Sequence, residues 1–151
     1  MTNINAFIKD WQSHRKVLQA MLDVVTTEQL SYRPWEKGMS VSELALHIAG
    51  AMNMFVSTVK NGAYTPGQKA TPPSTIEELK AKIAADTEQS EAILTSITPE
   101  QLEQSIDFFG HPITGAVLLQ NAKDHEIHHK GQMFVYLRMA GIENLPFFVS
   151  R

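Results

Sequence analysis

The chain has 151 residues, of which 43% are hydrophobic and 19% are charged, a composition typical of one globular domain over residues 1–151 with a substantial core. Its net charge of −3 argues against a nucleic-acid partner, and the lack of cysteine excludes disulfides, thiolate metal sites and a cysteine nucleophile. No apolar run approaches the roughly 20 residues of a membrane span, and the start lacks signal-peptide features, so we expect a cytoplasmic protein with no membrane partner.

The first segment with helical spacing of apolar residues covers about residues 5–25. His14 lies close to the apolar side of this segment, but no second histidine is in register with it. We therefore expect His14 to be capped or partly exposed rather than to assist a site. Residues 26–30 are expected to form a capped single turn, followed by an extended loop.

A second helix is predicted from Val41 to about Lys60, because Ser40 and Glu43 form a capping box at its start. This segment is apolar nearly all round, which is typical of a central helix. His47 lies in its middle. A lone histidine on such a helix is usually a satisfied core residue, so its role depends on the histidines further along the chain.

Residues 61–74 are rich in glycine and proline and indicate a loop. A loop of this length can span a whole helix, so the second helix and the third, at 75–96, can be parallel neighbours. Residues 105–109 are the only strand-like piece, and His111, which follows in a loop, is expected to be exposed.

The fourth and longest helix is predicted from Ile113 to about Ala140, where Gly141 stops it. The tail at 142–151 is too apolar to remain free in water, and we expect it to pack over the bundle or at a dimer contact. Four helices with almost no strand predict an all-α fold, a four-helix bundle with long loops between its helices.

His125 and His129 are four residues apart in the fourth helix and therefore point toward one side, where they can bind one metal ion. At about 100° per residue they share a core-facing stripe with several apolar residues, whereas Lys123 and Lys130 fall elsewhere. The other members of this stripe are Leu118, Ala122, Met133, Tyr136 and Ala140.

Catalytic zinc-type sites commonly use three protein ligands and leave one position open, which makes His47 the natural third ligand. His128 lies further round the helix, and we expect it to support a ligand rather than to bind the ion. Asp124 and Gln132 are similar candidates, and Gln132 lies on the site side, where it could also reach the open position or its water.

The sequence from His125 to His129 also satisfies H-E-x-x-H, the pattern of zinc metalloproteases. No β-sheet is predicted to hold an extended peptide, and no third ligand follows downstream, so the protease interpretation lacks its context. Glu126 remains a candidate general base because it is next to a predicted ligand.

The chain resembles the DinB/YfiT-like family of bacterial four-helix bundles. The resemblance rests on Leu46–Ile48, Asp124–Gln132 and the Tyr136–Gly141 ending followed by Pro146, and it covers essentially the whole chain. The motif commonly has arginine where this chain has Lys130. The resemblance implies an up-down-down-up bundle, often a homodimer, with a nickel, zinc or similar ion on three histidines. By position, these are His47, His125 and His129.

Three functions remain open. The family implies a metal-dependent hydrolase or a thiol-dependent transferase acting on a small molecule, and the absence of cysteine means that any thiol would come from a low-molecular-weight cofactor. The second is a non-catalytic stress-response protein that binds metal or a small ligand. The third is a structural bundle in which the histidines only pack and form hydrogen bonds.

Overall fold

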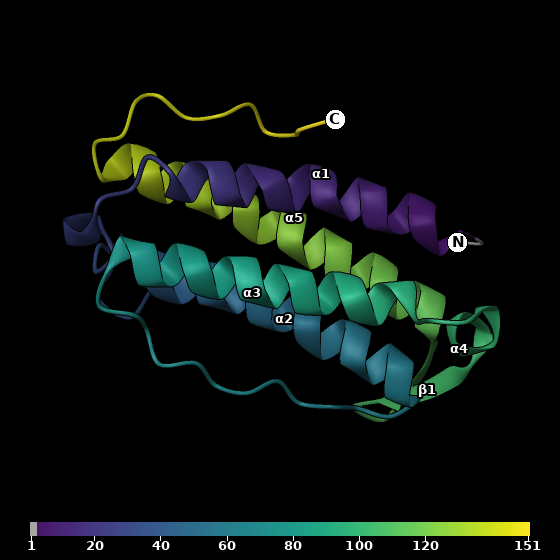
Figure 1. Ribbon diagram of the computed structural model, residues 1–151. Coiled ribbons are helices and arrows are strands. Elements are labelled where there is room, and N and C mark those ends of the chain that lie inside the picture. The colour runs from purple at the N-terminus through teal and green to yellow at the C-terminus, as the bar shows by residue number, and fades with distance from the viewer. Residues whose placement is uncertain (1–2) are drawn as a thin grey trace.

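The computed structural model describes residues 3–151, and four long helices form a bundle (Figure 1). They are α1 (Ile4–Leu22), α2 (Val41–Asn61), α3 (Ile76–Thr95) and α5 (Gly115–Met139). The short elements are η1 (Thr27–Gln29), α4 (Pro99–Glu103), β1 (Ser105–Phe108) and β2 (His111–Thr114). The predicted four-helix bundle is confirmed. In the described part of the chain, no helix is long and apolar enough to cross a membrane.

Each long helix packs against two others, which gives the bundle a square cross-section. α2 contacts α3 and α5, and α1 also contacts α3 and α5. α5 is therefore a corner helix with one face against α1 and another against α2. This placement decides where consecutive side chains of α5 point.

The long connection after α2 makes α2 and α3 parallel, as its length allowed. It runs back along the bundle from the end of α2 to the start of α3 (Figure 1). A Cβ atom built on Gly67 would lie 3.5 Å from the carbonyl oxygen of Gly50, so the connection lies directly against α2. With α1 and α5 running the other way, the order is up-down-down-up.

α2 begins where the sequence predicts. The Ser40 side chain accepts a hydrogen bond from the backbone N–H of Glu43, and the Glu43 carboxylate accepts one from the N–H of Ser40. This reciprocal pair satisfies two of the N–H groups that a helix start leaves without partners. The helix ends at Gly62, whose φ of 72° is the left-handed conformation favoured at helix ends.

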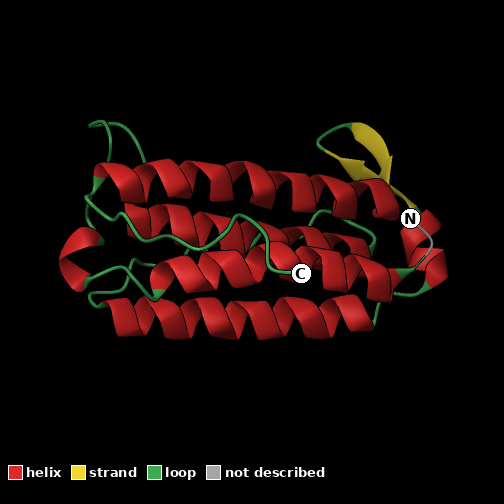
Figure 2. Ribbon diagram, turned by 90° about the horizontal axis from the view of Figure 1, so that it is seen from above, coloured by secondary structure: helices red, strands yellow, loops and turns green. Residues whose placement is uncertain are grey.

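A β-hairpin replaces the predicted start of the fourth helix. β1 pairs with β2 in antiparallel register, with Ile106 opposite Ile113, so α5 begins at Gly115 rather than at Ile113. Only glycine fits there, because a Cβ atom on Gly115 would collide with the carbonyl oxygen of Gln101. The hairpin lies at one end of the bundle (Figure 2). As predicted, His111 is exposed.

The C-terminal tail packs over the bundle, the first of the two expected arrangements (Figure 2). The backbone N–H of Ser150 donates to the carbonyl oxygen of Ser13 in α1 at 2.8 Å. Lys130 Nζ, on α5, donates to the carbonyl oxygen of Phe148 and lies 2.8 Å from His14 Nδ1. The tail is therefore attached to both helices by polar contacts.

Two residues beneath the tail differ from expectation. Lys130 and His14 are both buried, although the sequence placed Lys130 off the core-facing stripe and predicted a partly exposed His14. Burial lowers the pKa of His14, which favours a neutral ring that accepts a hydrogen bond at Nδ1 from Lys130. Lys130 is buried because it faces α1.

Gly131 does not mediate a close helix contact. A Cβ atom built on Gly131 would have no atom of another helix within 4 Å. In the bundle, Gly131 lies on the exposed face of α5.

Candidate metal centre

Three histidines converge from two neighbouring helices. His47 comes from α2, and His125 and His129 come from consecutive turns of α5. Each offers a nitrogen, and these three nitrogens all lie within 4.8 Å of one another. The Nε2 atoms of His47 and His125 are 3.1 Å apart. The structure thus brings together the three predicted ligands.

The spacing suits a small tetrahedral ion. Zinc–nitrogen bonds of about 2.0–2.1 Å at tetrahedral angles place the ligand nitrogens about 3.3–3.4 Å apart. The His47–His125 separation is 3.1 Å, and the three nitrogens lie within 4.8 Å, so modest rotation of the rings brings them to this spacing. Three neutral imidazoles are also a donor set that zinc and nickel accept.

The cluster lies at the surface rather than in the core. His47 is exposed, and His125 and His129 are half-buried. Met133 and Leu118, on the same predicted stripe, are fully buried, so the histidines occupy its outer edge. A site with three ligands and an accessible side leaves a coordination position that a substrate can reach.

The surroundings hold the imidazoles of His47 and His125 in the neutral form, which can bind metal. Burial lowers the pKa of His47, and burial with the nearby His129, His47 and His128 rings lowers the pKa of His125 to about 4. A metal ion needs the neutral ring, because a protonated nitrogen has no lone pair to donate. His47 and His125 are therefore neutral at physiological pH.

Gln132 orients His129. The Nδ1 atom of His129 lies 2.7 Å from the Gln132 amide oxygen, one turn along α5. Because that oxygen can only accept, Nδ1 carries the proton and Nε2 keeps its lone pair for a metal. Of the two roles predicted for Gln132, the hydrogen bond to His129 fits the support of a candidate ligand rather than contact with the open coordination position.

The two other predicted supporting residues lie outside the cluster. His128 is exposed, and its ring centroid is 4.8 Å from that of His129. Asp124 is also exposed, and its Oδ1 accepts a hydrogen bond from Gln120 Nε2 at 3.2 Å. His128 is thus next to one candidate ligand, whereas the hydrogen bond of Asp124 is made within α5 and to none of the three clustered histidines.

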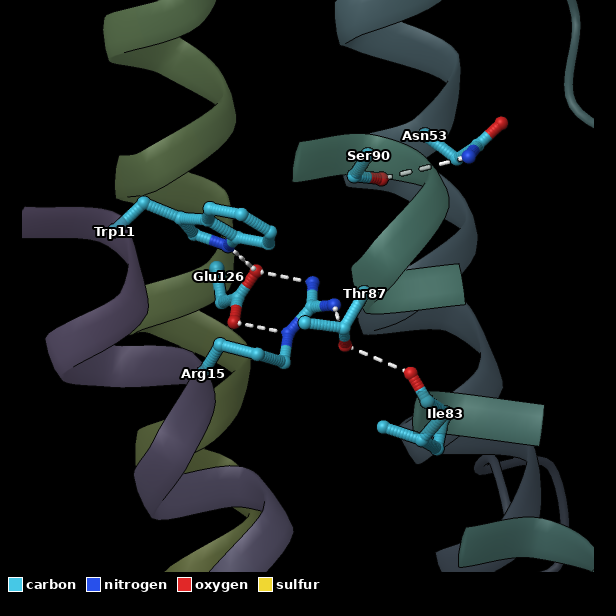
Figure 3. A network of polar contacts seen from close by, with 7 residues as sticks. All are labelled: Trp11, Arg15, Asn53, Ile83, Thr87, Ser90 and Glu126. Atoms are coloured by element: carbon cyan, nitrogen blue, oxygen red, sulfur yellow. Dashed lines mark hydrogen bonds and ion pairs between the residues drawn. The ribbon is translucent and has the colours of Figure 1, made fainter. Parts of the chain in front are cut away.

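Glu126 faces α1 and is bound in a buried network (Figure 3). Its Oε1 accepts hydrogen bonds from Trp11 Nε1 at 2.9 Å and Arg15 Nη2 at 2.6 Å, and its Oε2 accepts from Arg15 Nε at 2.7 Å. Arg15 also donates to the Thr87 hydroxyl on α3 at 2.8 Å. This arrangement does not support the predicted role of Glu126 as a base, because both oxygens already pair with α1.

The metal-free protein is expected to lose stability as the pH falls from about 6.5 toward about 4. His125 titrates near 6.5 when unfolded, but its folded pKa is about 4. Between these values the unfolded chain binds more protons, so acid favours unfolding, and the stability is fully present above about 6.5. Urea unfolding at several pH values measures this effect. His125→Gln, which cannot titrate, should show a shallower dependence, and an equal slope in both proteins would contradict the assignment.

Sequence reasoning missed two features beside the histidines. His47 borders a cavity of about 690 Å³ between α2, α3 and the connection at 66–72, lined on α2 by Gly50, Ala51 and Met54 among others. On the other side, the Phe55 ring lies 6.4 Å from the His125 ring. The spacing of His47, Ala51 and Phe55 along one helix face was visible in the sequence, but the path of the connection was not.

Comparison with known proteins gives consistent matches over the whole chain. The profile of the DinB family matches residues 1–151. The chain is 38% identical to the uncharacterised protein YjoA of Bacillus subtilis, covering 100% of this chain and 99% of YjoA. It is 24% identical to the uncharacterised protein YrdA of the same organism, covering 92% of this chain and 84% of YrdA.

Solved structures show the same fold. The crystal structure of YjoA, a DinB-like protein, superimposes with a TM-score of 0.86 and covers 97% of this chain and 99% of that one at 38% identity. A DinB-like protein from Bacillus cereus gives a TM-score of 0.80 at 28% identity, covering 97% of each chain. Sequence profile, relatives and structure agree over nearly the full length, and the chain belongs to the DinB family.

Proposed function

We propose that this protein is a divalent-metal-dependent enzyme that acts on a small molecule, as a hydrolase or a thiol-dependent transferase. His47, His125 and His129 would hold the ion, with zinc or nickel the metals that fit three imidazoles. The observation that carries the proposal is the convergence of three imidazole nitrogens within 4.8 Å at an accessible surface.

The chemistry follows from the charge of the site. When bound, a divalent ion supplies Lewis acidity and lowers the pKa of a water or thiol at the open position. Three neutral histidines leave the positive charge uncompensated, which favours an anionic fourth ligand. Because the chain has no cysteine, a thiol would have to come from a small-molecule cofactor.

The chain's own residues would bind the substrate and orient the proposed metal ligands. Gln132 holds the His129 ring in the tautomer that leaves Nε2 free. The cavity beside His47 has space for a small substrate, and Glu43, Asn53 and Gln89 in its lining offer hydrogen-bonding groups. These features support binding of a polar substrate group next to the proposed ligands.

Turnover is expected with zinc-loaded or nickel-loaded wild-type protein. It should be lost in His125→Ala. Thiol conjugation of electrophiles and hydrolysis of amides and esters should each be followed, with and without added thiol. A dependence on thiol would select the transferase over the hydrolase. His111→Ala is the matched control, because His111 is an exposed histidine of the hairpin and not of the cluster. Equal turnover in wild type and His125→Ala would contradict the proposal.

A non-catalytic binding protein is the second candidate, and one observation favours it. The two residues that the sequence suggested as a base or as a contact to the open coordination position are both occupied, Glu126 by Arg15 and Gln132 by His129. A site without an available base can bind metal and a ligand without turning it over. Ligand affinity at the loaded site with no turnover under either metal would select this function.

A further inference from the structure

Four aromatic side chains extend outward from the histidines and form one continuous surface, which we call the aromatic shelf: Phe55, Tyr64, Phe108 and Phe109. Phe55 lies 6.4 Å from His125 and stacks on Phe108 at 5.7 Å between ring centroids. Phe108 contacts Tyr64 at 5.9 Å and Phe109 at 4.8 Å, and Tyr64 lies 4.7 Å from Phe109. The shelf combines α2, the connection after it and the hairpin.

Phe109 is in an unfavourable position in two respects. Its φ is 53°, the left-handed region that non-glycine residues rarely adopt, and Gly110 follows at 83°. Two-residue hairpin turns of this conformation strongly prefer Asn-Gly or Asp-Gly. The Phe109 side chain is also 69% exposed, so burial does not compensate for its backbone conformation. A residue that breaks a local rule and still leaves most of its surface exposed suggests a functional constraint.

We propose that the aromatic shelf binds an aromatic or other planar apolar group of the substrate, while the polar reacting group of the same molecule lies at the three histidines. The proposal rests on the proposed function, because it assigns that site its substrate class. The proposal is supported by the position of the shelf, because Phe55 at its inner end lies beside the ring of His125, a proposed metal ligand. Aromatic rings pair with centroids about 4.5–7 Å apart, which matches the spacing within the shelf.

The size of the shelf favours a small molecule over a protein partner. Only Phe109, at 69%, and Tyr64, at 43%, are strongly exposed, whereas Phe55 and Phe108 are half-buried. Stable protein interfaces bury about 800 Å² per partner, far more than two side chains offer. A single ring lying on the shelf uses the exposed aromatic area, while the polar end of the same molecule extends past Phe55 toward His125.

A pair of hydroxamates tests the proposal on the full-length, zinc-loaded protein. Acetohydroxamate carries only the metal-binding group, and 3-phenylpropionohydroxamate adds a ring on a short linker. Wild type is expected to bind the phenyl compound about tenfold more tightly by titration calorimetry, the scale of one aromatic contact with its burial. Phe109→Asn should abolish this preference while its melting temperature rises, because asparagine suits the left-handed turn. Zinc content is measured after each titration.

Phe147→Asn is the matched control, because Phe147 is 70% exposed but belongs to the C-terminal tail. It should keep the preference. If wild type binds both hydroxamates equally well, the proposed role of the shelf is overturned and the metal-site proposal is left intact. Failure of both compounds to bind zinc-loaded protein would overturn the two proposals together. A wild-type dimer that Phe109→Asn makes monomeric, with the preference unchanged, would show that the shelf contacts a second copy instead.

Discussion

Wild-type protein is expected to take up about one zinc or nickel ion per chain, and His129→Ala is expected to lose it. The substitution removes one of three converging nitrogens and leaves His47 and His125, whose Nε2 atoms are 3.1 Å apart. Two imidazoles at a half-open site bind zinc or nickel much more weakly than three. Elemental analysis should follow incubation with either metal and gel filtration, on protein without a histidine tag.

Two further variants give this measurement a graded control. Gln132→Ala keeps all three ligands but removes the acceptor on His129 Nδ1, and we expect its affinity to fall about 10–100-fold. His111→Ala should match the wild type, because His111 is an exposed histidine of the hairpin. Wild-type protein that takes up neither zinc nor nickel would contradict the metal site, and the histidines would then be packing residues.

Glu126→Ala is expected to lower the free energy of unfolding by about 3–5 kcal/mol, the cost of breaking a buried ion pair. Arg15 is fully buried, and Glu126 is 1% exposed. Removing the carboxylate leaves the Arg15 guanidinium charged and without its main acceptor, and leaves Trp11 Nε1 without a partner. Urea unfolding followed by circular dichroism gives the free energy directly.

Replacing both residues at once separates the energy of the Arg15–Glu126 ion pair from the effect of the volume that the two side chains fill. Arg15→Met with Glu126→Leu removes both charges at similar volume and should recover much of the stability lost in Glu126→Ala. Unchanged stability in Glu126→Ala would contradict a structural role. A folded Glu126→Gln variant that binds metal normally but has lost turnover would restore Glu126 as a base.

The local features of the fold were predictable because they depend on near neighbours in the chain. The capping box at Ser40 and Glu43 needs only residues three apart, and it starts α2 where expected. His125 and His129 are one helical turn apart, so any helix places them on one side. The length of the 61–74 connection allowed parallel helices, and the structure has them.

The hairpin was only half predicted, because pairing is not local. The strand-like segment at 105–109 was visible, but its partner contains Pro112 and begins what looked like a helix. The helix start at Gly115 depends on contact with Gln101 in α4, which no spacing reveals. The aromatic shelf depends on the same hairpin, since Phe108 meets Phe55 only after the chain has folded back.

By itself, the sequence determined the four long helices apart from the start of the last, the capping box at Ser40, the pair of histidines on one face and the family resemblance. Only the tertiary structure decided what consecutive residues of α5 contact. Neighbours on a helix differ by about 100°, and α5 lies at a corner between α1 and α2. His125 and His129 therefore meet His47 on α2, whereas Glu126 and Lys130 meet Arg15 and His14 on α1. The apolar stripe indicates only the buried face of α5 toward α2. The face toward α1 carries Glu126 and Lys130, charged residues that become buried only together with their partners on α1.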